Sequence, residues 1–482
     1  MIIQSVWQVS FDFLGGKPIV VAPQRAQLTR DAGLLPIRQL DEELGLTVAF
    51  AAALHDPRAP EAITHSFVEM VRMRIYGILA GYPDQNDHDV LRYDPVFKLV
   101  AGRSPEDQHL ASQPTLSRFE NSIDIPSLRR LQDVFLDQFI ASFATPPRHL
   151  TFDIDVFDDP THGQQQLTFF HGYYDQYQYL PRVITCKEND LVVMICLLFG
   201  TAHPTLGIED DLTNLVERLR AVWPDVQISI RGDSGFAVPK MYLLCEDLRL
   251  NYTFGLGMNA VLKRQSEEVL EEALQKYEQT GQPQRLFTAF WYQAQTWSKP
   301  RFTIIKAEAH AQGTNRRAVV TNRPGAVALP QATYDEYTER GESENRNKEL
   351  KCGLAADRLS DHRYMANLLR LYLHAAVANL LVRVRQVAAD PPPPASPTDL
   401  PTEALAGKDR RDYFNHRRER DPLGEGHPCT WRTRLIKVAA EIVVRARRII
   451  VRLAGSWPYL EHYRQVAAAI LSVRLGTRLD SG

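Results

Sequence analysis

Cysteine is scarce in this sequence, and the few cysteines are scattered. An odd number of them occurs among 482 residues, and no two form a C-x-x-C pair: Cys186, Cys196, Cys245, Cys352 and Cys429. Such a set argues against a disulfide framework and against a structural zinc site. We therefore expect a protein of a reducing cytoplasm.

The sequence also lacks an excess of charge of either sign. Lysine and arginine number 56 and aspartate and glutamate 58, which gives a formal net charge of −2. A chain that carries a general signature for nucleic acid is basic as a whole. Any DNA contact must therefore depend on local clusters of cations.

Long hydrophobic runs are missing as well. The longest, Leu191 to Phe199, is too short to span a bilayer and is typical of a buried strand. Residues 1–16 contain no charged segment followed by an apolar run, so no signal peptide is expected. We expect no membrane association, and the 44% apolar and 24% charged residues are ordinary for a globular protein.

One charged segment, residues 337–351, has an informative spacing: YTERGESENRNKELK. At about 100° per residue, Tyr337, Arg340, Glu344 and Lys351 fall within roughly 60° of one another around a helix. That face would carry a carboxylate, two cations and a phenol, which suits a divalent metal beside phosphate oxygens. Taken alone, such a segment is more often a solvated helix face.

Acids also occur on two predicted strands. The run LTFDIDVFDD, from Leu150, alternates with period two and puts Asp153 and Asp155 on one strand face. Asp233 follows the predicted strand VQISI, and strand ends of α/β sheets commonly bind ligands. Acids on a strand suited to a core are costly unless they are paired or bind metal. Simple turn roles for Asp155 and Asp233 stay open.

The chain divides into predicted regions by composition. Residues 1–145 are mostly helical, and residues 146–388 combine strands and helices as in an α/β fold, with a β-rich insertion at about 262–328. A proline-rich and charged linker is expected at 389–425, followed by a basic helical region at 426–482.

Within the last region, Arg432 to Leu453 is predicted to form an amphipathic basic helix. Its cationic stripe would comprise Arg434, Arg445, Arg448 and Arg452. The stripe could grip DNA phosphates, or it could be a solvated helix face.

The order of the three acidic motifs is similar to the catalytic layout of ribonuclease H-like enzymes. The motifs DIDVFDDPTHGQQQ, RGDSGF and YTERGESENRNKELK resemble those of bacterial insertion-sequence DDE transposases with the Y-x2-R-x3-E-x6-K signature, in the group whose first-aspartate motif contains D-P-T-H-G-Q-Q. The resemblance covers about residues 145–385. It implies an α/β fold with a ribonuclease H-like core and a catalytic, metal-binding triad of Asp155, Asp233 and Glu344, with Asp153 as the alternative first acid.

The resemblance also implies cofactors and partners. The triad would hold two Mg²⁺ or Mn²⁺ ions, and the partner would be double-stranded DNA, both transposon ends and target. Residues expected to contact DNA phosphates near the cut are Tyr337, Arg340 and Lys351, with Arg231 as a weaker candidate. Arg445 and Arg448 are further candidates for DNA contact, as members of the cationic stripe. The helical N-terminal region would bind transposon ends, and a homodimer associated with the nucleoid is expected. Trp291 or Trp297 could stack on an extruded base, although a core role is the favoured interpretation for both.

These observations predict a transposase that cuts transposon ends and joins their 3′-hydroxyls to target DNA. Two alternatives remain open. One is a DNA-binding relic that no longer cuts, and the other is a ribonuclease H-like nuclease without strand transfer.

Overall fold

A mixed sheet of ten strands lies at the centre of the computed structural model, which describes residues 7–13, 17–24, 26–389 and 427–479. The strand order is β11 (Gln284–Tyr292), β12 (Arg301–His310), β13 (Gly313–Thr321), β10, β9, β4 and β7, and β5, β6 and β8 also pair with β7. Strands β9 and β10 run parallel to β4, whereas β7 runs antiparallel to it and β8 antiparallel to β7. The bounds are β4 (His149–Val156), β5 (Asp159–Pro160), β6 (Phe169–His171), β7 (Gln176–Cys186), β8 (Val192–Phe199), β9 (Gln227–Gly232) and β10 (Asn251–Leu256).

The alternation predicted for the first strand is confirmed. Phe152 and Ile154 of β4 are fully buried on one face, packed against helix α7 (Ile125–Ile140) and helix α8 (Ile208–Val222). Asp153 and Asp155 lie on the other face because successive strand residues point to opposite sides. The same apolar cluster includes helix α9 (Pro239–Asp247), which links β9 to β10.

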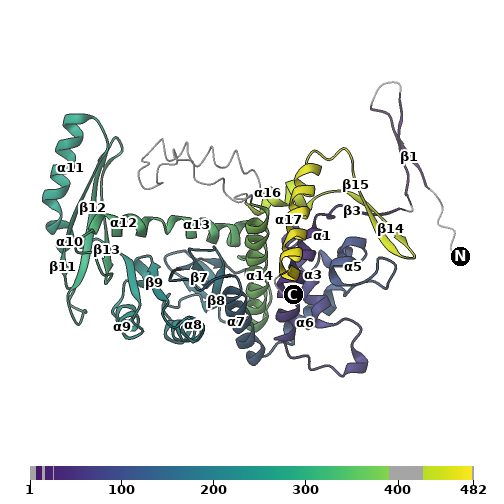
Figure 1. Cartoon of the computed structure of the whole chain (residues 1–482), viewed down its shortest axis with the longest axis horizontal. Helices are drawn as coiled ribbons and strands as arrows, with labels where there is room; N and C mark the ends of the chain where they lie inside the picture. Colours follow the sequence, from purple (N-terminus) through teal and green to yellow (C-terminus); the bar gives the residue numbers. More distant parts are fainter. Residues whose placement is uncertain (1–6, 14–16, 25, 390–426, 480–482) are drawn as a thin grey trace.

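The predicted β-strands of the insertion are also present. Strands β11 (Gln284–Tyr292), β12 (Arg301–His310) and β13 (Gly313–Thr321) form an antiparallel extension of the sheet through β10. The predicted long helix from Asn259 is instead two helices, α10 (Ala260–Gln265) and α11 (Glu267–Thr280), separated at Ser266. Figure 1 shows this extension at one end of the molecule.

Helix α14 (Tyr364–Ala388) packs into a core shared by both ends of the chain. Its apolar residues contact the N-terminal helices and C-terminal residues such as Trp431 and Ile470 in one cluster. Among the described residues, α14 alone is long and apolar enough to cross a membrane, yet 83% of its apolar window is buried inside the protein. The core therefore accounts for its hydrophobicity. The other helices of this half are α1 (Leu34–Leu44), α2 (Leu46–Ala52), α3 (Phe67–Ala80), α4 (His88–Leu91), α5 (Pro95–Ala101) and α6 (Gln113–Asn121).

The predicted basic helix at Arg432 to Leu453 is wrong. After helix α16 (Pro428–Trp431), the chain makes a π-helical turn at Arg432–Ile436 and then a hairpin of β14 (Ala440–Arg445) and β15 (Arg448–Leu453). Strand β14 pairs on its other edge with β3 (Gln27–Thr29), from the opposite end of the chain. The hairpin is rich in β-branched residues, which favour strands. The third strand of this small sheet, β3, is distant in the sequence, so the local pattern of the C-terminal segment could not reveal the pairing.

The cationic stripe therefore does not exist as a helix face. Arg445 and Arg448 are cross-strand neighbours beside the exposed turn of the hairpin, and Arg452 pairs with Glu441. A helix does occur further on, α17 (Leu460–Leu479). The predicted linker at 389–425 lies, apart from its first residue, outside the described residues.

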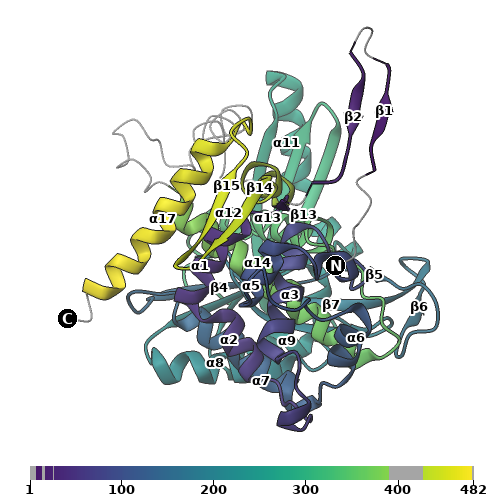
Figure 2. The ribbon, with the colours of Figure 1, turned by 90° about the vertical axis from the view of Figure 1, so that its right-hand side faces the viewer.

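A separate two-stranded hairpin stands at the N-terminal end. It consists of β1 (Val9–Phe11) and β2 (Ile19–Val21), paired antiparallel. Both views show it projecting from the body of the molecule (Figures 1 and 2).

Candidate active site

Two parallel strands bring the predicted acids Asp155 and Asp233 together. In the register of β4 and β9, Ile154 lies beside Gly232, so the next residue of each strand is an aspartate. Asp233 directly follows β9, where its carboxylate accepts a hydrogen bond of 2.9 Å from the amide of Gly235. Two carboxylates from distant parts of the chain thus share the carboxyl-terminal ends of adjacent strands.

The surroundings of Asp155 disfavour its ionised form. Its Oδ1 accepts the amide of Val156 at 2.9 Å, and its Oδ2 accepts the side-chain amide of Asn347 at 3.1 Å. Burial raises the pKa of Asp155 to about 6, against the opposing effect of Arg340 and with a further increase from the charge of Asp233. A carboxylate that is costly to ionise in this way favours a bound cation.

The helix with the informative spacing is not a single regular helix. It consists of α12 (Pro330–Thr338), α13 (Gly341–Lys348) and a π-helical turn at Glu349–Gly353. Short i to i+3 hydrogen bonds join the first two pieces, for example from Arg340 N to Tyr337 O at 3.1 Å. Figure 1 shows α12 and α13 running across the molecule from the β insertion towards α14. The ideal angle of about 100° per residue therefore does not hold from end to end.

Tyr337 nevertheless reaches the strand ends. Its hydroxyl donates to the carbonyl of Gly232 at 3.3 Å, just before Asp233. It also passes so close to Gly255 of β10 that a Cβ there would lie 2.6 Å from the phenol oxygen. Gly255 is thus the residue that gives the tyrosine room to enter.

Arg340 links the first and third acids of the predicted triad. Its Nη1 lies 3.1 Å from Oε1 of Glu344 and 3.7 Å from Oδ2 of Asp155. The Arg340 side chain is 8% exposed, whereas that of Glu344 is 56% exposed. Over the part of the chain that the structure describes, no three acidic, histidine or cysteine side chains are gathered as a metal cage. The positive charge that lies between the carboxylates of Asp155 and Glu344 is the guanidinium of Arg340.

Asp153, the alternative first acid, is engaged elsewhere. Both of its oxygens accept hydrogen bonds from Arg231, at 2.7 Å and 2.8 Å, and the two residues are 3% and 2% exposed. Arg231 donates its remaining nitrogen to the carbonyl of Glu336 at 2.6 Å, which ties β9 to α12. This closed pair leaves Asp153 no free oxygen for a metal and Arg231 no accessible group for DNA.

Lys351 contacts a different acid from the one that its spacing suggested. Its ammonium pairs with Asp158, which also accepts a 3.2 Å hydrogen bond from the amide of Gln176. Asp158 and Asn347 were not identified from the sequence. Asn347 could have been noticed, because it lies three residues after Glu344 on the same short helix. Asp158 follows the end of β4, and nothing in its sequence context except its acidity pointed to the site.

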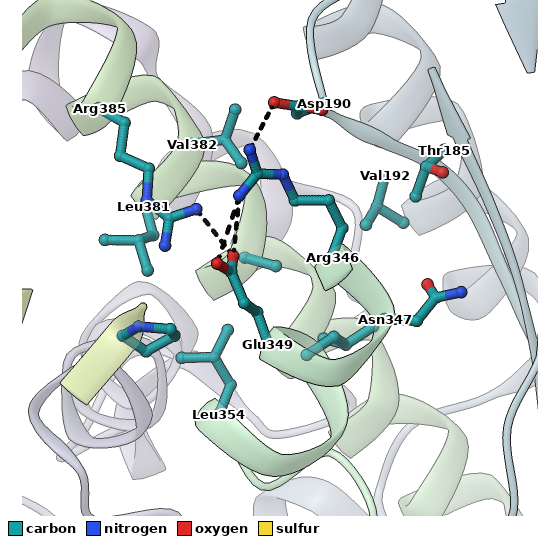
Figure 3. A pocket seen from close by; sticks show the side chains of 13 residues that line it. Thr185, Asp190, Val192, Arg346, Asn347, Glu349, Leu354, Leu381, Val382 and Arg385 are labelled. Atoms are coloured by element: carbon teal, nitrogen blue, oxygen red, sulfur yellow. Dashed lines mark hydrogen bonds and ion pairs between the residues drawn. The ribbon is translucent and has the colours of Figure 1, made fainter. Parts of the chain in front are cut away.

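The end of this segment is secured by a buried cluster of charges. Glu349 accepts hydrogen bonds from Arg346 at 3.2 Å and from Arg385 of α14 at 2.8 Å, and Arg346 also pairs with Asp190 at 2.9 Å. Figure 3 shows both arginines pointing at Glu349 from opposite sides. Because these charges neutralise one another, the cluster anchors the segment to α14 and the β7–β8 turn rather than offering a free carboxylate.

The remaining predicted contacts lie apart from this edge. Arg445 and Arg448 belong to the hairpin of β14 and β15. Figure 1 shows this hairpin on the opposite side of α14 from β9. Trp297 is 6% exposed and belongs to the apolar core, as favoured, but Trp291 is 64% exposed.

Comparisons with known proteins give a family match over most of the chain. The family model described as transposase DDE domain group 1 matches residues 11–395. No match to a curated protein sequence is found. A solved structure, the piggyBac transposase synaptic complex with hairpin DNA, is similar over 74% of this chain and 77% of that chain, with 15% sequence identity and a TM-score of 0.40.

Proposed function

This chain belongs to the DDE transposases, in the family described as transposase DDE domain group 1, and we propose that it cuts the strands at transposon ends and joins the freed 3′-hydroxyls to target DNA. The catalytic acids are Asp155, Asp233 and Glu344. The observation that carries the proposal is the meeting of Asp155 and Asp233 at the ends of adjacent parallel strands. Their electrostatic coupling and the raised pKa of Asp155 support it.

The core of the proposed enzyme is ribonuclease H-like. Supporting this, β8, β7 and β4 form an antiparallel meander, and β9 and β10 then add in parallel to β4. Asp155 lies at the end of β4, the first strand of this core. Asp233 directly follows β9, the first strand that runs parallel to β4. The β insertion then separates the second acid from Glu344.

The residues present fit a divalent cation in chemical kind. Carboxylate oxygens are the ligands that Mg²⁺ and Mn²⁺ prefer, and a buried carboxylate whose pKa is about 6 is stabilised by a nearby positive charge. We propose that Asp155, Asp233 and Glu344 hold two such ions. When bound, the ions would activate the attacking oxygen and stabilise the leaving oxygen of a phosphodiester.

The other residues of the site would position the DNA strand. Arg340 is held near the acids by Asp155 and Glu344, and the same guanidinium can instead donate two parallel hydrogen bonds to a phosphate. Two further side chains would contact neighbouring phosphates. They are Tyr337 of α12, whose hydroxyl reaches the end of β9, and Lys351, which pairs with Asp158. Asn347 keeps the Asp155 carboxylate oriented. Asp153 and Arg231 would contact neither metal nor DNA. Their ion pair would serve only to hold β4 and β9 in position.

Double-stranded DNA is the proposed partner, and a homodimer would bring two transposon ends together. Arg445 and Arg448 remain proposed contacts to DNA outside the site, now as an exposed hairpin turn rather than a helix face. The N-terminal helical half is the proposed region for recognising the ends.

The experiment is incubation of the full chain with Mg²⁺ and the DNA that flanks its own gene. We expect nicks at inverted-repeat ends, followed by joined products, and both should vanish in Glu344→Gln. Binding without nicking would favour an inactive DNA-binding relic. Cutting without any joined product would favour a nuclease without strand transfer.

A further inference from the structure

The N-terminal hairpin of β1 and β2 has one face made only of apolar side chains. In the register of the two strands, Val9 lies beside Val21 and Phe11 lies beside Ile19. These four residues point to the same side, and the alternation along β1 puts the residues two positions before and after it on that side as well. We call this side the apolar face, and its members are Trp7, Val9, Phe11, Phe13, Ile19 and Val21.

The opposite face of the hairpin is more polar. Ser10 and Val20 are its register pair, and Gln8 and Asp12 lie on either side of Ser10 along the chain. A two-sided strand pair of this kind is typical of a sheet that packs against another surface through its apolar side. Val20 and Val21 are adjacent valines on opposite faces, so they form a matched pair for experiments.

Nothing in the described part of the chain covers the apolar face. Phe13 is 78% exposed, Trp7 54%, Phe11 48% and Val21 43%. Across residues 7–13 and 17–24, no residue is buried and none packs into a hydrophobic core. Figures 1 and 2 show the hairpin projecting from the body. An isolated two-stranded hairpin is only marginally stable in water, and an exposed apolar patch marks an interaction site. The face therefore calls for a partner.

The composition of the face indicates the kind of partner. The apolar face carries no charge and no hydroxyl or amide group. Lys17 is the only cation among residues 7–13 and 17–24, so this part of the hairpin offers little to the phosphates of DNA, which are bound by cations. The partner is instead an apolar protein surface.

A second copy of the same chain provides such a surface. A two-fold symmetric contact uses the same patch on both subunits, so the patch must complement itself. Two flat apolar faces meet without burying a charge or an unpaired polar group. They would form two layers of strands about 10 Å apart, which is the usual spacing of packed sheets. Because the hairpin projects, two copies can bring their hairpins together while their bodies stay apart.

The size of the face agrees with a contact between two copies. An aromatic side chain buries about 150–250 Å², and the aromatic side chains of this face are half to three-quarters exposed. Together with the aliphatic side chains, they offer roughly 500 Å² per copy. Two copies would therefore bury roughly 1,000 Å² in total, which reaches the size expected of a specific interface.

We infer that two copies of this chain associate through the apolar faces of their N-terminal hairpins, packed face to face about a two-fold axis. This contact supplies an interface for the homodimer of the proposed function. The inference rests on that function only for the purpose of the pairing, which is to bring two transposon ends together.

The test measures the mass of the full chain without DNA, by sedimentation over a range of concentrations. We expect wild type to reach twice the chain mass of 54.8 kDa at micromolar concentration. Phe11→Asp should raise the dissociation constant on the order of 100-fold, because it places a charge in a closed apolar contact. Val21→Asp should raise it about tenfold or more for the same reason.

Val20→Asp is the matched control and should dimerise as wild type does. It adds the same charge to the neighbouring residue of the same strand, so any general loss of hairpin structure is common to both valine variants. Equal dimerisation of Val20→Asp and Val21→Asp would overturn the inference. Thermal unfolding checks that the body of each variant is intact.

A mixing experiment asks whether the two hairpins meet each other. Phe11→Asp and Phe11→Lys chains should each be monomeric alone, whereas an equimolar mixture should recover dimers, because opposite charges then face each other across the contact. Failure of the mixture to recover dimers would mean that each hairpin docks on a different surface of the partner, which contradicts contact between the apolar faces.

Two further results would also overturn the inference. One is a wild-type chain that stays monomeric at all concentrations. The other is a monomeric chain whose affinity for DNA falls in Phe11→Asp but not in Val20→Asp, because the apolar face would then belong to DNA.

The inference and the proposed function fail separately. A chain that dimerises through Phe11 and Val21 but never nicks the DNA flanking its gene contradicts the proposed function alone. A chain that nicks and joins these ends, but whose mass is the same in wild type and Phe11→Asp, contradicts the inference alone.

Discussion

Two aspartates on the same face of β4, only two residues apart, have opposite environments. Asp153 lies within the sheet, where Arg231 occupies both of its oxygens and neither side chain reaches solvent. Asp155 lies at the strand end, where it meets Asp233 and has only a more distant guanidinium at 3.7 Å for compensation. The first carboxylate is neutralised by the fold itself. The second is left with excess negative charge that a ligand can neutralise.

The comparison shows that acidity on a strand face does not identify a catalytic residue. What distinguishes the two positions is whether a cation from a neighbouring strand is in register. Arg231 is the register partner of Asp153, whereas the position beside Asp155 is occupied by another acid. The acid that is paired within the sheet is therefore structural, and the acid proposed to be catalytic lies where the pairing ends.

The largest expected effect is on catalysis at Asp155. Asp155→Asn should reduce strand cleavage by on the order of 10³-fold or more, because it removes a charged ligand from a site that acts by electrostatic stabilisation. Its folded state should be as stable as wild type or more so, since the substitution removes a charge that is costly to bury. Gel assays of nicking and urea unfolding check the two parts, and a well-folded variant that still cuts would remove Asp155 from the triad.

The second effect concerns the stability of the Asp153–Arg231 pair. Asp153→Asn should lower the free energy of unfolding by about 3–5 kcal/mol, because it leaves the buried guanidinium uncompensated. Replacing both partners, as Asp153→Leu with Arg231→Met, should recover most of that loss. Urea denaturation of the three chains measures this, and a fully stable Asp153→Asn that fails to cut would reverse the roles assigned to the two acids.

The third effect is the pH dependence of the metal-free protein. Because the pKa of Asp155 is raised from 3.8 to about 6, the folded chain holds this proton more tightly than the unfolded chain. Its contribution to stability is therefore present at low pH and is lost as pH rises between these values, by up to about 3 kcal/mol. Unfolding in EDTA should show a difference between wild type and Asp155→Asn that grows over this range. A difference independent of pH would mean that Asp155 is not strained.

The smallest effect extends the comparison to cations. Arg231 is buried and paired, whereas Arg445 and Arg448 are exposed at a hairpin turn. Arg445→Ala with Arg448→Ala should reduce the slope of log affinity for DNA against log salt by about 1–2, with little change in sequence preference. Arg464→Ala, which removes an exposed arginine of α17 that pairs with Glu461, is the matched control. Equal slopes in all chains would exclude the hairpin turn from the DNA contact.

Much of the central sheet could be predicted from local patterns. The period-two alternation of β4, the apolar run of β8 and the strands of the insertion all carry their structure in a few neighbouring residues. The structure of the basic C-terminal segment could not be predicted from local patterns. Its apolar residues fit both a helical and an extended pattern. The extended form is stabilised by pairing with β3, a segment about four hundred residues away in the chain.

For the site, the sequence by itself determined which residue types were available and in what order: two acids at strand ends and a glutamate among cations on a later helix. It could not determine which acid was free, because that depends on the register of β4 against β9 and on Arg231. Nor could it show that Arg340 spans Asp155 and Glu344, that Lys351 pairs with Asp158, or that Gln176 of β7 contacts the same aspartate. Local periodicity reports the direction of a side chain from its own backbone, whereas charge pairing depends on elements that only the tertiary structure brings together.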